Sequence, residues 1–393
     1  MCGVFMPFAI YVLGLAVFAQ GTSEFMLSGL GPDIASDLNV SIPAAGALTS
    51  AFAVGMIVGA PLMAVLSMRW PQRSALLVFL TAFMAVHVVG AVTTSFAVLL
   101  ATRVLGALAN AGFLAVGLAA ATGMVSSSAK GRATSALLGG VTLACVAGVP
   151  AGALLGQVWG WRSAFWAVAL VSVPALFAIV RSVPRTEAVE APSARGELRA
   201  LRSPRLLVTL GLGTLVNAAT FCTFTYLSPL ITNVSGFGES WVPAVLALFG
   251  LGSFAGVTVA GRWSDARPML VLVPGGAALL VGWLLLSVGA DRPGVAVVLV
   301  LVQGMLSFGV GSTLITRALY AAAEAPALGG AFATAALNVG AAAGPALGGL
   351  TLGAGLGYRS PVWVSALLVA LAFAVAGLAS AAPSGALASR RGR

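Results

Sequence analysis

Long apolar stretches alternate with short polar ones along the whole chain. Each apolar stretch has the roughly 20 residues that a helix needs to cross a bilayer core of about 30 Å. The spans cover residues 7–31, 44–67, 74–94, 96–124, 134–157, 162–181, 205–232, 241–263, 268–289, 294–318, 329–353 and 360–382. The pattern predicts an all-α membrane protein with twelve transmembrane helices.

A polar segment divides these spans into two groups of six. Residues 182–204 hold three prolines and many charged residues and show no apolar periodicity, which is typical of a solvated linker. We therefore expect a six-helix half over residues 1–181, a linker over 182–204, a second half over 205–382 and a basic tail over 383–393.

Composition excludes soluble folds and most enzyme classes. Apolar residues make up 60% of the chain and charged residues 8%, against about 25% charged in soluble domains. The one histidine, His87, leaves no Ser-His pair or zinc site to build, and no phosphate-binding loop or paired cysteine motif occurs. We expect a transporter, with no metal and no catalytic residues.

Basic residues predict the orientation. Sixteen of the 20 Lys and Arg lie in the loops, linker and tail or at the span ends on the side of the termini, and Arg103 lies well inside a span. Only Arg162, Arg292 and Arg359 lie on the opposite side. Since cytoplasmic loops are enriched in basic residues, both termini are predicted to be cytoplasmic.

The two halves repeat each other at an offset of 197 residues. The matching positions are Phe52, Gly55, Gly59 and Ser67 with Phe249, Gly252, Gly256 and Ser264, and Gly152, Gly156, Gly160, Arg162 and Ser163 with Gly349, Gly353, Gly357, Arg359 and Ser360. Parallel six-span halves with a pathway between them are the architecture of major facilitator transporters.

The fifth and eleventh spans carry a glycine–proline pattern. Its positions are Gly148, Pro150 and Gly152, within GVPAGALLGQVWGWRSAFW, and Gly340, Gly344, Pro345, Gly348 and Gly349. Glycine lets helices approach closely, and proline removes a hydrogen bond and bends the helix. With these motifs the whole chain resembles the twelve-span drug:proton antiporters of the major facilitator superfamily. A plain packing interface is the alternative interpretation.

The loop after the second span of each half resembles the family's cytoplasmic gate. The C-terminal copy has Gly261, Arg262 and Asp265. The N-terminal copy has Arg69 and Arg73, but Met68 stands where the family has an acidic residue. Arg69 and Arg73 remain candidates for the gate, and the alternative is that they act as orientation charges alone.

Arg103 lies in the fourth span, where an arginine costs about 3 kcal/mol or more at bilayer depth. It should therefore face the cavity and find an acceptor. The resemblance implies a role in proton coupling, and an arginine that reaches toward the membrane surface is the alternative.

Glu24 is the only acidic residue well inside a predicted helix. Burial disfavours the charged form of a carboxyl, so Glu24 can take up and release a proton. The resemblance places a second acid at Asp33. Nine residues of unbroken helix put the two on different faces, and the Gly31-Pro32 pair can break the helix and leave Asp33 in a cap or loop.

Other polar and aromatic side chains are candidates for the cavity wall. They are Asn110, Phe113, Asn217, Phe221, Phe224, Tyr226, Gln303 and Asn338. Each can equally be an interhelical hydrogen-bonding residue or lipid-facing bulk. His87, in mid-span, is interpreted as packed and hydrogen-bonded rather than as a proton relay.

We expect a proton-coupled exporter of small amphipathic drugs in the bacterial cytoplasmic membrane. The runs EFMLSGLGPDIASDL and GVPAGALLGQVWGWRSAFW resemble actinobacterial chloramphenicol-resistance exporters. The expected partners are a small-molecule drug, protons as the coupling ion and the lipid bilayer, with no cofactor, no nucleic acid and a monomeric chain. A sugar or metabolite exporter is the alternative. A membrane sensor is weaker, because no loop exceeds about 25 residues.

Overall fold

The computed structural model describes residues 7–67, 70–126, 130–184, 203–264, 267–322 and 329–381. All regular elements in these residues are helical, and twelve helical segments are long and apolar enough to cross a membrane. The predicted fold class is thereby confirmed. The linker falls largely outside the described residues, which stop at 184 and resume at 203. The helix α8 ends at Ser182, and α10 begins at Pro204.

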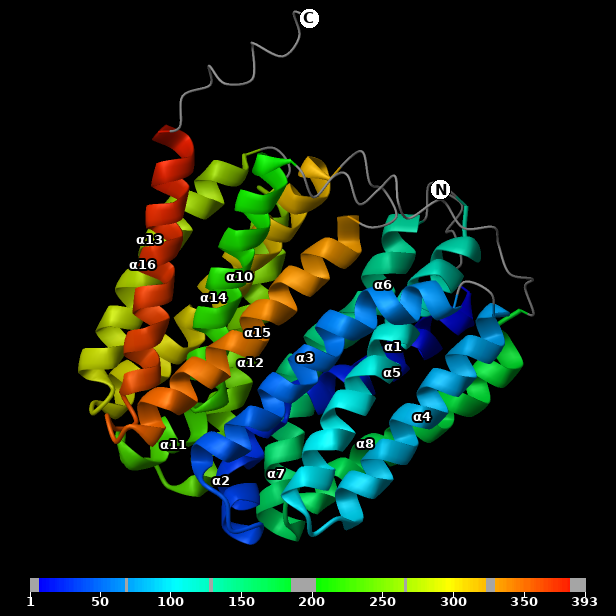
Figure 1. Cartoon of the computed structure of the whole chain (residues 1–393), viewed down its shortest axis with the longest axis horizontal. Helices are drawn as coiled ribbons and strands as arrows, with labels where there is room; N and C mark the ends of the chain where they lie inside the picture. Colours follow the sequence, from blue (N-terminus) through cyan, green and yellow to red (C-terminus); the bar gives the residue numbers. More distant parts are fainter. Residues whose placement is uncertain are drawn as a thin grey trace, which may run out of the picture.

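The first half places six spans in the order predicted (Figure 1). Its elements are α1 (Phe8–Phe25), α2 (Leu27–Asp37), α3 (Ile42–Ser67), α4 (Gln72–Val92), α5 (Phe96–Gly123), α6 (Lys130–Leu143), the π-helical segment η2 (Ala144–Gly148), α7 (Val149–Trp159) and α8 (Arg162–Ser182). The fifth span is thus α6, η2 and α7 in series. Pro150 stands in the first turn of α7, directly after the π-helical segment, so the irregularity lies beside the motif proline.

The second half repeats this order. Its elements are α10 (Pro204–Thr225), α11 (Leu227–Asn233), the 3₁₀ turn η4 (Glu239–Trp241), α12 (Val242–Gly261), α13 (Pro268–Gly289), α14 (Pro293–Ala321), α15 (Gly329–Gly353) and α16 (Ser360–Ala381). We call the side on which α1 begins and α16 ends the termini end, and the other side the loop end (Figure 1).

The first span of each half is interrupted once. The N-terminal break lies at Met26, between α1 and α2, and the C-terminal break lies at Tyr226, between α10 and α11. The expectation that Gly31 and Pro32 break the helix is wrong, because both lie inside α2. A proline removes only one backbone donor, a loss that a membrane helix tolerates.

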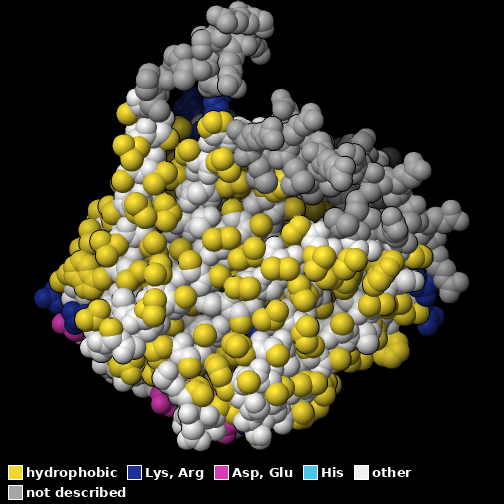
Figure 2. Space-filling view, in the orientation of Figure 1, with side chains coloured by type: hydrophobic (Ala, Val, Ile, Leu, Met, Phe, Trp, Pro, Cys, Tyr) yellow, Lys and Arg dark blue, Asp and Glu magenta, His cyan; other side chains and the backbone are white. Residues whose placement is uncertain are grey.

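The surface agrees with a lipid environment. Apolar side chains cover the face shown in Figure 2, and its charged side chains lie near the ends of the bundle. Large apolar residues are widely exposed, including Leu350, Leu367 and Phe177. A soluble protein rarely exposes a continuous apolar surface of this kind.

The two halves meet along α3–α15 and along α12–η2. Ser50 donates a hydrogen bond of 2.8 Å to the Ala342 carbonyl across the first contact. At the second, Gly250 lies directly against the Cys145 carbonyl, so that a Cβ there would overlap it. The largest buried apolar cluster includes residues of both halves, so the boundary is packed like a core.

The repeat arginines make matching contacts at the loop end. Arg162 pairs with Asp37 at 2.6 Å and donates to the Thr93 carbonyl at the end of α4. Arg359 pairs with Asp291 at 3.2 Å and donates to the Val288 carbonyl in the last turn of α13. Each arginine therefore bonds a carbonyl at the end of the third span of its half. The acids differ in position, because Asp37 is the last residue of α2 and Asp291 follows α13.

We expect Asp37→Asn to lower the free energy of unfolding by about 0.5 to 1 kcal/mol at pH 7, because the pair is partly exposed. Hydrogen bonds from Arg162 and Trp161 lower the pKa of Asp37 below its ordinary value. The contribution is therefore present above the ordinary aspartate pKa and fades as the pH falls through the lowered one. Thermal unfolding of detergent-purified protein at pH 7 and pH 3 measures it. Asp291→Asn, a longer and more exposed pair, should cost less.

Candidate functional site

Glu24 lies in the last turn of α1, at the boundary between the halves. The neighbouring Phe25 ring is 5.7 Å from that of Phe221 in the other half. Within the described part of the chain the Glu24 carboxyl makes no hydrogen bond, and its electrostatic partners are Arg103 and Cys145. Glu24 as a residue is partly exposed, whereas its neighbour Ser23 is fully buried. No hydrogen bond within the described residues therefore fixes the protonation state of this carboxyl.

Arg103 is 1% exposed and is held at its tip by Ser23. Nη1 donates to the Ser23 hydroxyl and Nη2 to the Ser23 carbonyl, each at 2.8 Å. The guanidinium carbon also lies 4.5 Å from the Phe52 ring centroid, a cation–π contact. The prediction that Arg103 finds an acceptor is confirmed, and its burial excludes the surface-reaching alternative. It makes no salt bridge with Glu24, so the two charges interact through space.

His87 completes this network. Nε2 lies 2.6 Å from the Ser23 hydroxyl, and Nδ1 lies 2.7 Å from the Phe83 carbonyl. The ring packs at a tilt between two aromatic neighbours, with centroid distances of 4.1 Å to Phe83 and 5.8 Å to Phe165. The interpretation of His87 as packed and hydrogen-bonded is confirmed.

Asp33 belongs to a different place. It lies exposed on α2, toward the loop end, where its electrostatic neighbour is Glu239. Nine residues separate it from Glu24, about 13 Å of helix rise. The structure therefore separates Asp33 from the Glu24–Arg103 pair, and its role in coupling stays a prediction.

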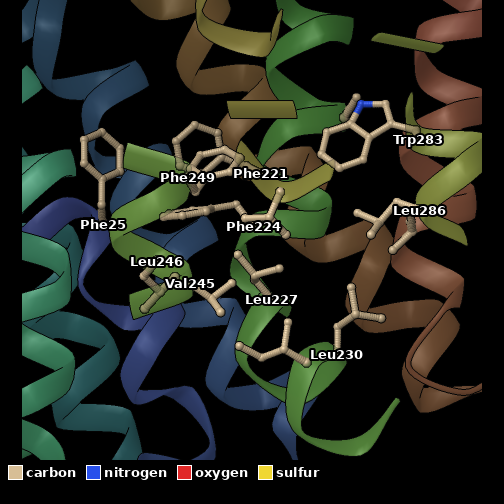
Figure 3. Packing of buried hydrophobic residues seen from close by; sticks show 14 of the residues in the cluster. Phe25, Phe221, Phe224, Leu227, Leu230, Val245, Leu246, Phe249, Trp283 and Leu286 are labelled. Carbon is tan, nitrogen blue, oxygen red and sulfur yellow. The ribbon is translucent and has the colours of Figure 1, made fainter. Parts of the chain in front are cut away.

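Phe221 and Phe224 lie in a row of rings with Phe25 and Phe249 (Figure 3). We call Phe25, Phe221, Phe224 and Phe249 the aromatic row. Ring centroids are 6.2 Å apart for Phe221–Phe224 and 4.6 Å apart for the stacked Phe224–Phe249. The row runs from the N-terminal half into the C-terminal half.

The amide candidates are used mostly for packing. Asn217 donates to the Leu337 carbonyl of α15 at 2.6 Å, and Asn338 donates to the Thr334 carbonyl of its own helix at 2.9 Å. Asn110 is buried, with its Nδ2 on the Met56 sulfur at 3.6 Å and its Oδ1 without a partner. Phe113 is fully buried in a core cluster that belongs to the N-terminal half alone.

Tyr226 lies at the break between α10 and α11, at the contact between the halves. Its hydroxyl donates to the Pro345 carbonyl at 2.8 Å, and its ring packs against Gly46 of α3 and Gly349 of α15. It also lines a small pocket between the halves, together with Thr49 and Thr225, whose buried hydroxyls have no partner.

The N-terminal glycine–proline motif packs the fifth span against the first. Gly148 lies against Thr22, and Gly152 lies against Met26. Pro150 is buried in α7 beside them. The π-helical segment that precedes α7 reaches the other half through Cys145, so the motif stands at the boundary between the halves.

The C-terminal copy packs the eleventh span against the seventh. Gly340 and Gly344 lie against the backbone of α10, and Gly348 lies against Tyr226. Gly349 is the exception, because it also faces Pro43 of the N-terminal half. Close packing thus occurs at these motif glycines, and Gly349 in addition faces the other half, as does the segment that contains Gly148. The role of the motif in antiport stays a prediction.

The gate residues can be described only in part. Arg69 and Asp265 lie outside the described residues. Arg73 is partly buried in the first turn of α4, while Gly261 and Arg262 are exposed at the end of α12. The structure therefore leaves the gate itself as a prediction.

Sequence reasoning missed several residues of the site. Ser23, Phe25, Phe249 and Cys145 are adjacent to predicted residues in space, but nothing in the local sequence marks them. Gln20, one turn before Glu24, is buried with neither amide atom paired. Its spacing of four from Glu24 was a signal that could have found it. Among the described residues, no three His, Cys, Asp or Glu side chains gather to hold a metal ion.

Comparison with known proteins agrees with this architecture. Residues 13–335 match the family model described as the Major Facilitator Superfamily. The chain is 57% identical to a chloramphenicol resistance protein of Streptomyces lividans, over 94% of this chain and 96% of that one. It is 33% identical to the inner membrane transport protein YdhP of Escherichia coli K12, over 93% and 94%.

Solved structures share the fold at low identity. A bacterial homologue of the human lysosomal transporter Spinster, in an inward-facing and occupied conformation, superposes with a TM-score of 0.76 at 15% identity, over 94% and 96% of the two chains. The human organic anion transporter MFSD10 gives 0.67 at 19% identity, over 93% and 97%. From its twelve spans, its repeated halves and the family match, the chain belongs to the Major Facilitator Superfamily.

Proposed function

We propose that the chain exports small amphipathic drugs, chloramphenicol first among them, in exchange for protons. The observation that carries this proposal is Glu24, whose carboxyl makes no hydrogen bond among the described residues and interacts electrostatically with the buried Arg103. Glu24 directly precedes Phe25, whose ring contacts Phe221 of the other half. The 57% identity to the chloramphenicol resistance protein supports the substrate and a role in antibiotic resistance. The twelve spans and the bacterial relatives make the chain a multi-pass protein of the bacterial cytoplasmic membrane.

The proposed mechanism needs only two conformations and one exchanging site. Deprotonated Glu24 favours drug binding when the site opens to the cytoplasm. On the other side a proton replaces the drug, and the protonated form returns. Both ligands act by biasing the same equilibrium between states. Exchange of one proton for a neutral drug moves one charge inward, which contributes about 2.3 kcal/mol at 100 mV.

The chemistry of the site favours a neutral aromatic substrate. One carboxyl offers a single anionic acceptor, and the aromatic row offers flat apolar faces against which an aromatic ring stacks. A sugar would need many paired polar groups, whereas the amides of Asn217 and Asn338 are already bonded to carbonyls. The site therefore supports a drug over the sugar alternative.

Uptake of radiolabelled chloramphenicol into energised inverted membrane vesicles tests this function. We expect uptake above that of vesicles without the protein, and its loss when a protonophore collapses the gradient. Labelled arabinose serves as the comparison substrate. Arabinose uptake without chloramphenicol uptake would replace the drug exporter by a sugar exporter. Drug uptake that survives the protonophore would contradict proton coupling.

A further inference from the structure

The hydrogen bonds around Arg103 can run in only one direction. Arg103 has no acceptor, so it must donate to the Ser23 hydroxyl. The Phe83 carbonyl has no donor, so Nδ1 of His87 must carry the proton of the bond between them. That leaves Nε2 of a neutral His87 as the acceptor for the single hydroxyl proton of Ser23.

This series of hydrogen bonds from Arg103 to the Phe83 carbonyl is complete only while His87 is neutral. A doubly protonated ring would donate from Nε2 to Ser23, whose own hydroxyl proton would then lose its acceptor. It would also place a second positive charge near Arg103. All three side chains are at most 3% exposed, so water cannot substitute for a missing partner at low cost.

This series of hydrogen bonds fixes the position of the arginine charge relative to Glu24. Ser23 and Glu24 are consecutive residues of α1, yet the guanidinium binds the serine and makes no salt bridge with the carboxyl. With the Ser23 carbonyl as a second acceptor, both terminal nitrogens of Arg103 have partners. Only Nε lacks one. The positive charge is thus held near the carboxyl without being paired to it.

We propose that Ser23 and His87 are positioning residues that hold Arg103 off the Glu24 carboxylate and thereby set the pH range over which Glu24 exchanges its proton. This inference rests on the proposed proton coupling. We call the hydrogen-bonded pair of Ser23 and His87 the tether. Without the tether, Arg103 can pair directly with ionised Glu24, and an opposite charge in contact favours the ionised form of a carboxyl. The function of the tether is therefore to keep Glu24 able to accept a proton near neutral pH.

Few other charges bear on this exchange. The groups that face Glu24 are Arg103 on α5 and the Cys145 thiol in η2. Arg103 is also the charged group that faces His87. The remaining neighbours of the network are Phe52 on α3, Phe83 on α4 and Phe165 on α8, none of which titrates.

The test is the pH profile of chloramphenicol-driven proton release from energised inverted vesicles, for Ser23→Ala and His87→Ala. We expect the midpoint to move by about 1 to 2 units to lower pH in Ser23→Ala. His87→Ala should move it in the same direction by a smaller amount. Because His87 acts through Ser23, the double variant should match Ser23→Ala alone. Ser23→Thr keeps the hydroxyl and should restore the wild-type midpoint.

Two controls separate positioning from a structural effect. Ser172→Ala removes a buried hydroxyl of the same half that bonds only its own helix, and it should leave the midpoint unchanged. Thermal unfolding of each variant identifies loss of fold, and the midpoint is compared only among folded variants. Ser23→Thr then tests the proposal even where the alanine variants are unstable.

The possible failures are distinguishable. If wild type releases no protons, the proposed function itself fails. If wild type couples and Glu24→Gln does not, while both Ser23→Ala and His87→Ala keep the wild-type midpoint, only the tether is overturned. A shift to higher pH also overturns it, because that would mean that the tether brings Arg103 toward Glu24.

Discussion

Replacing Glu24 by Gln should abolish active drug export. One proton moving down 100 mV carries about 2.3 kcal/mol, enough to support a drug gradient of about 50-fold. An amide of the same size cannot exchange that proton, so the variant should lose this gradient. Accumulation of labelled chloramphenicol in energised inverted vesicles measures the effect, and the resistance of cells that express the variant should fall to that of cells without the protein.

Glu24→Asp is the matched control. It keeps a carboxyl at the same position, and we expect it to retain measurable energy-dependent accumulation. Full activity of Glu24→Gln would show that the proton is carried elsewhere. Since Glu24 makes no hydrogen bond within the described part of the chain, neither variant should alter the thermal stability by much.

Alanine at two glycines with equally close neighbours should have different effects, lowering transport at Gly250 and thermal stability at Gly344. A Cβ on Gly250 would overlap the Cys145 carbonyl across the boundary between the halves, while one on Gly344 would overlap the Ala218 carbonyl within the C-terminal half. Overpacking of this kind costs about 1 to 3 kcal/mol. In Gly250→Ala the two halves can move apart and relieve this overlap. The arrangement of the halves seen in the structure should therefore become about 5- to 150-fold less populated, and transport should fall.

In Gly344→Ala the clash lies inside one folded half and cannot be relieved by that movement. We expect it to lower the free energy of unfolding by about 1 to 3 kcal/mol. Thermal unfolding should therefore separate the two variants. In a chain that lacks Cys2 and Cys222, maleimide labelling of the buried Cys145 should be faster in Gly250→Ala than in wild type. Equal labelling rates together with a lowered thermal stability would contradict the boundary role of Gly250.

The helices could be predicted from the sequence because a span is defined by length and hydropathy alone. The twelve stretches match the helices of the structure within a few residues at most ends. The breaks at Met26 and Tyr226 could not, because neither residue is a glycine or a proline and both breaks depend on packing. The predicted break at Gly31-Pro32 is wrong because a membrane helix tolerates the loss of the one backbone donor that a proline removes.

The site could be predicted where a residue type is costly in lipid. Glu24 and Arg103 stand out because a charge in a span needs a reason to be there. Whether an aromatic residue faces the protein interior or the lipid could not be predicted. Lipid is as apolar as a protein core, so hydropathy does not distinguish the two sides of a helix. Phe113 and Phe221 are both phenylalanines inside predicted spans, yet Phe113 lies in the core of its own half and Phe221 in a cluster shared by the two halves.

The partners of Arg103 depend on how three helices are rotated against each other. Ser23, His87 and Arg103 lie on α1, α4 and α5, more than 60 residues apart for the first two. Sequence indicated that the arginine needs an acceptor but not which residue provides it. The same holds for the contact between η2 and α12.

The most direct test of the central claim is proton movement on addition of chloramphenicol to energised inverted vesicles, followed with a pH-sensitive dye in wild type and Glu24→Gln. If Glu24 couples drug to proton, wild type releases protons when the drug is added and Glu24→Gln releases none. Equal proton release from both would contradict coupling through Glu24, and no release from wild type would contradict drug:proton exchange itself.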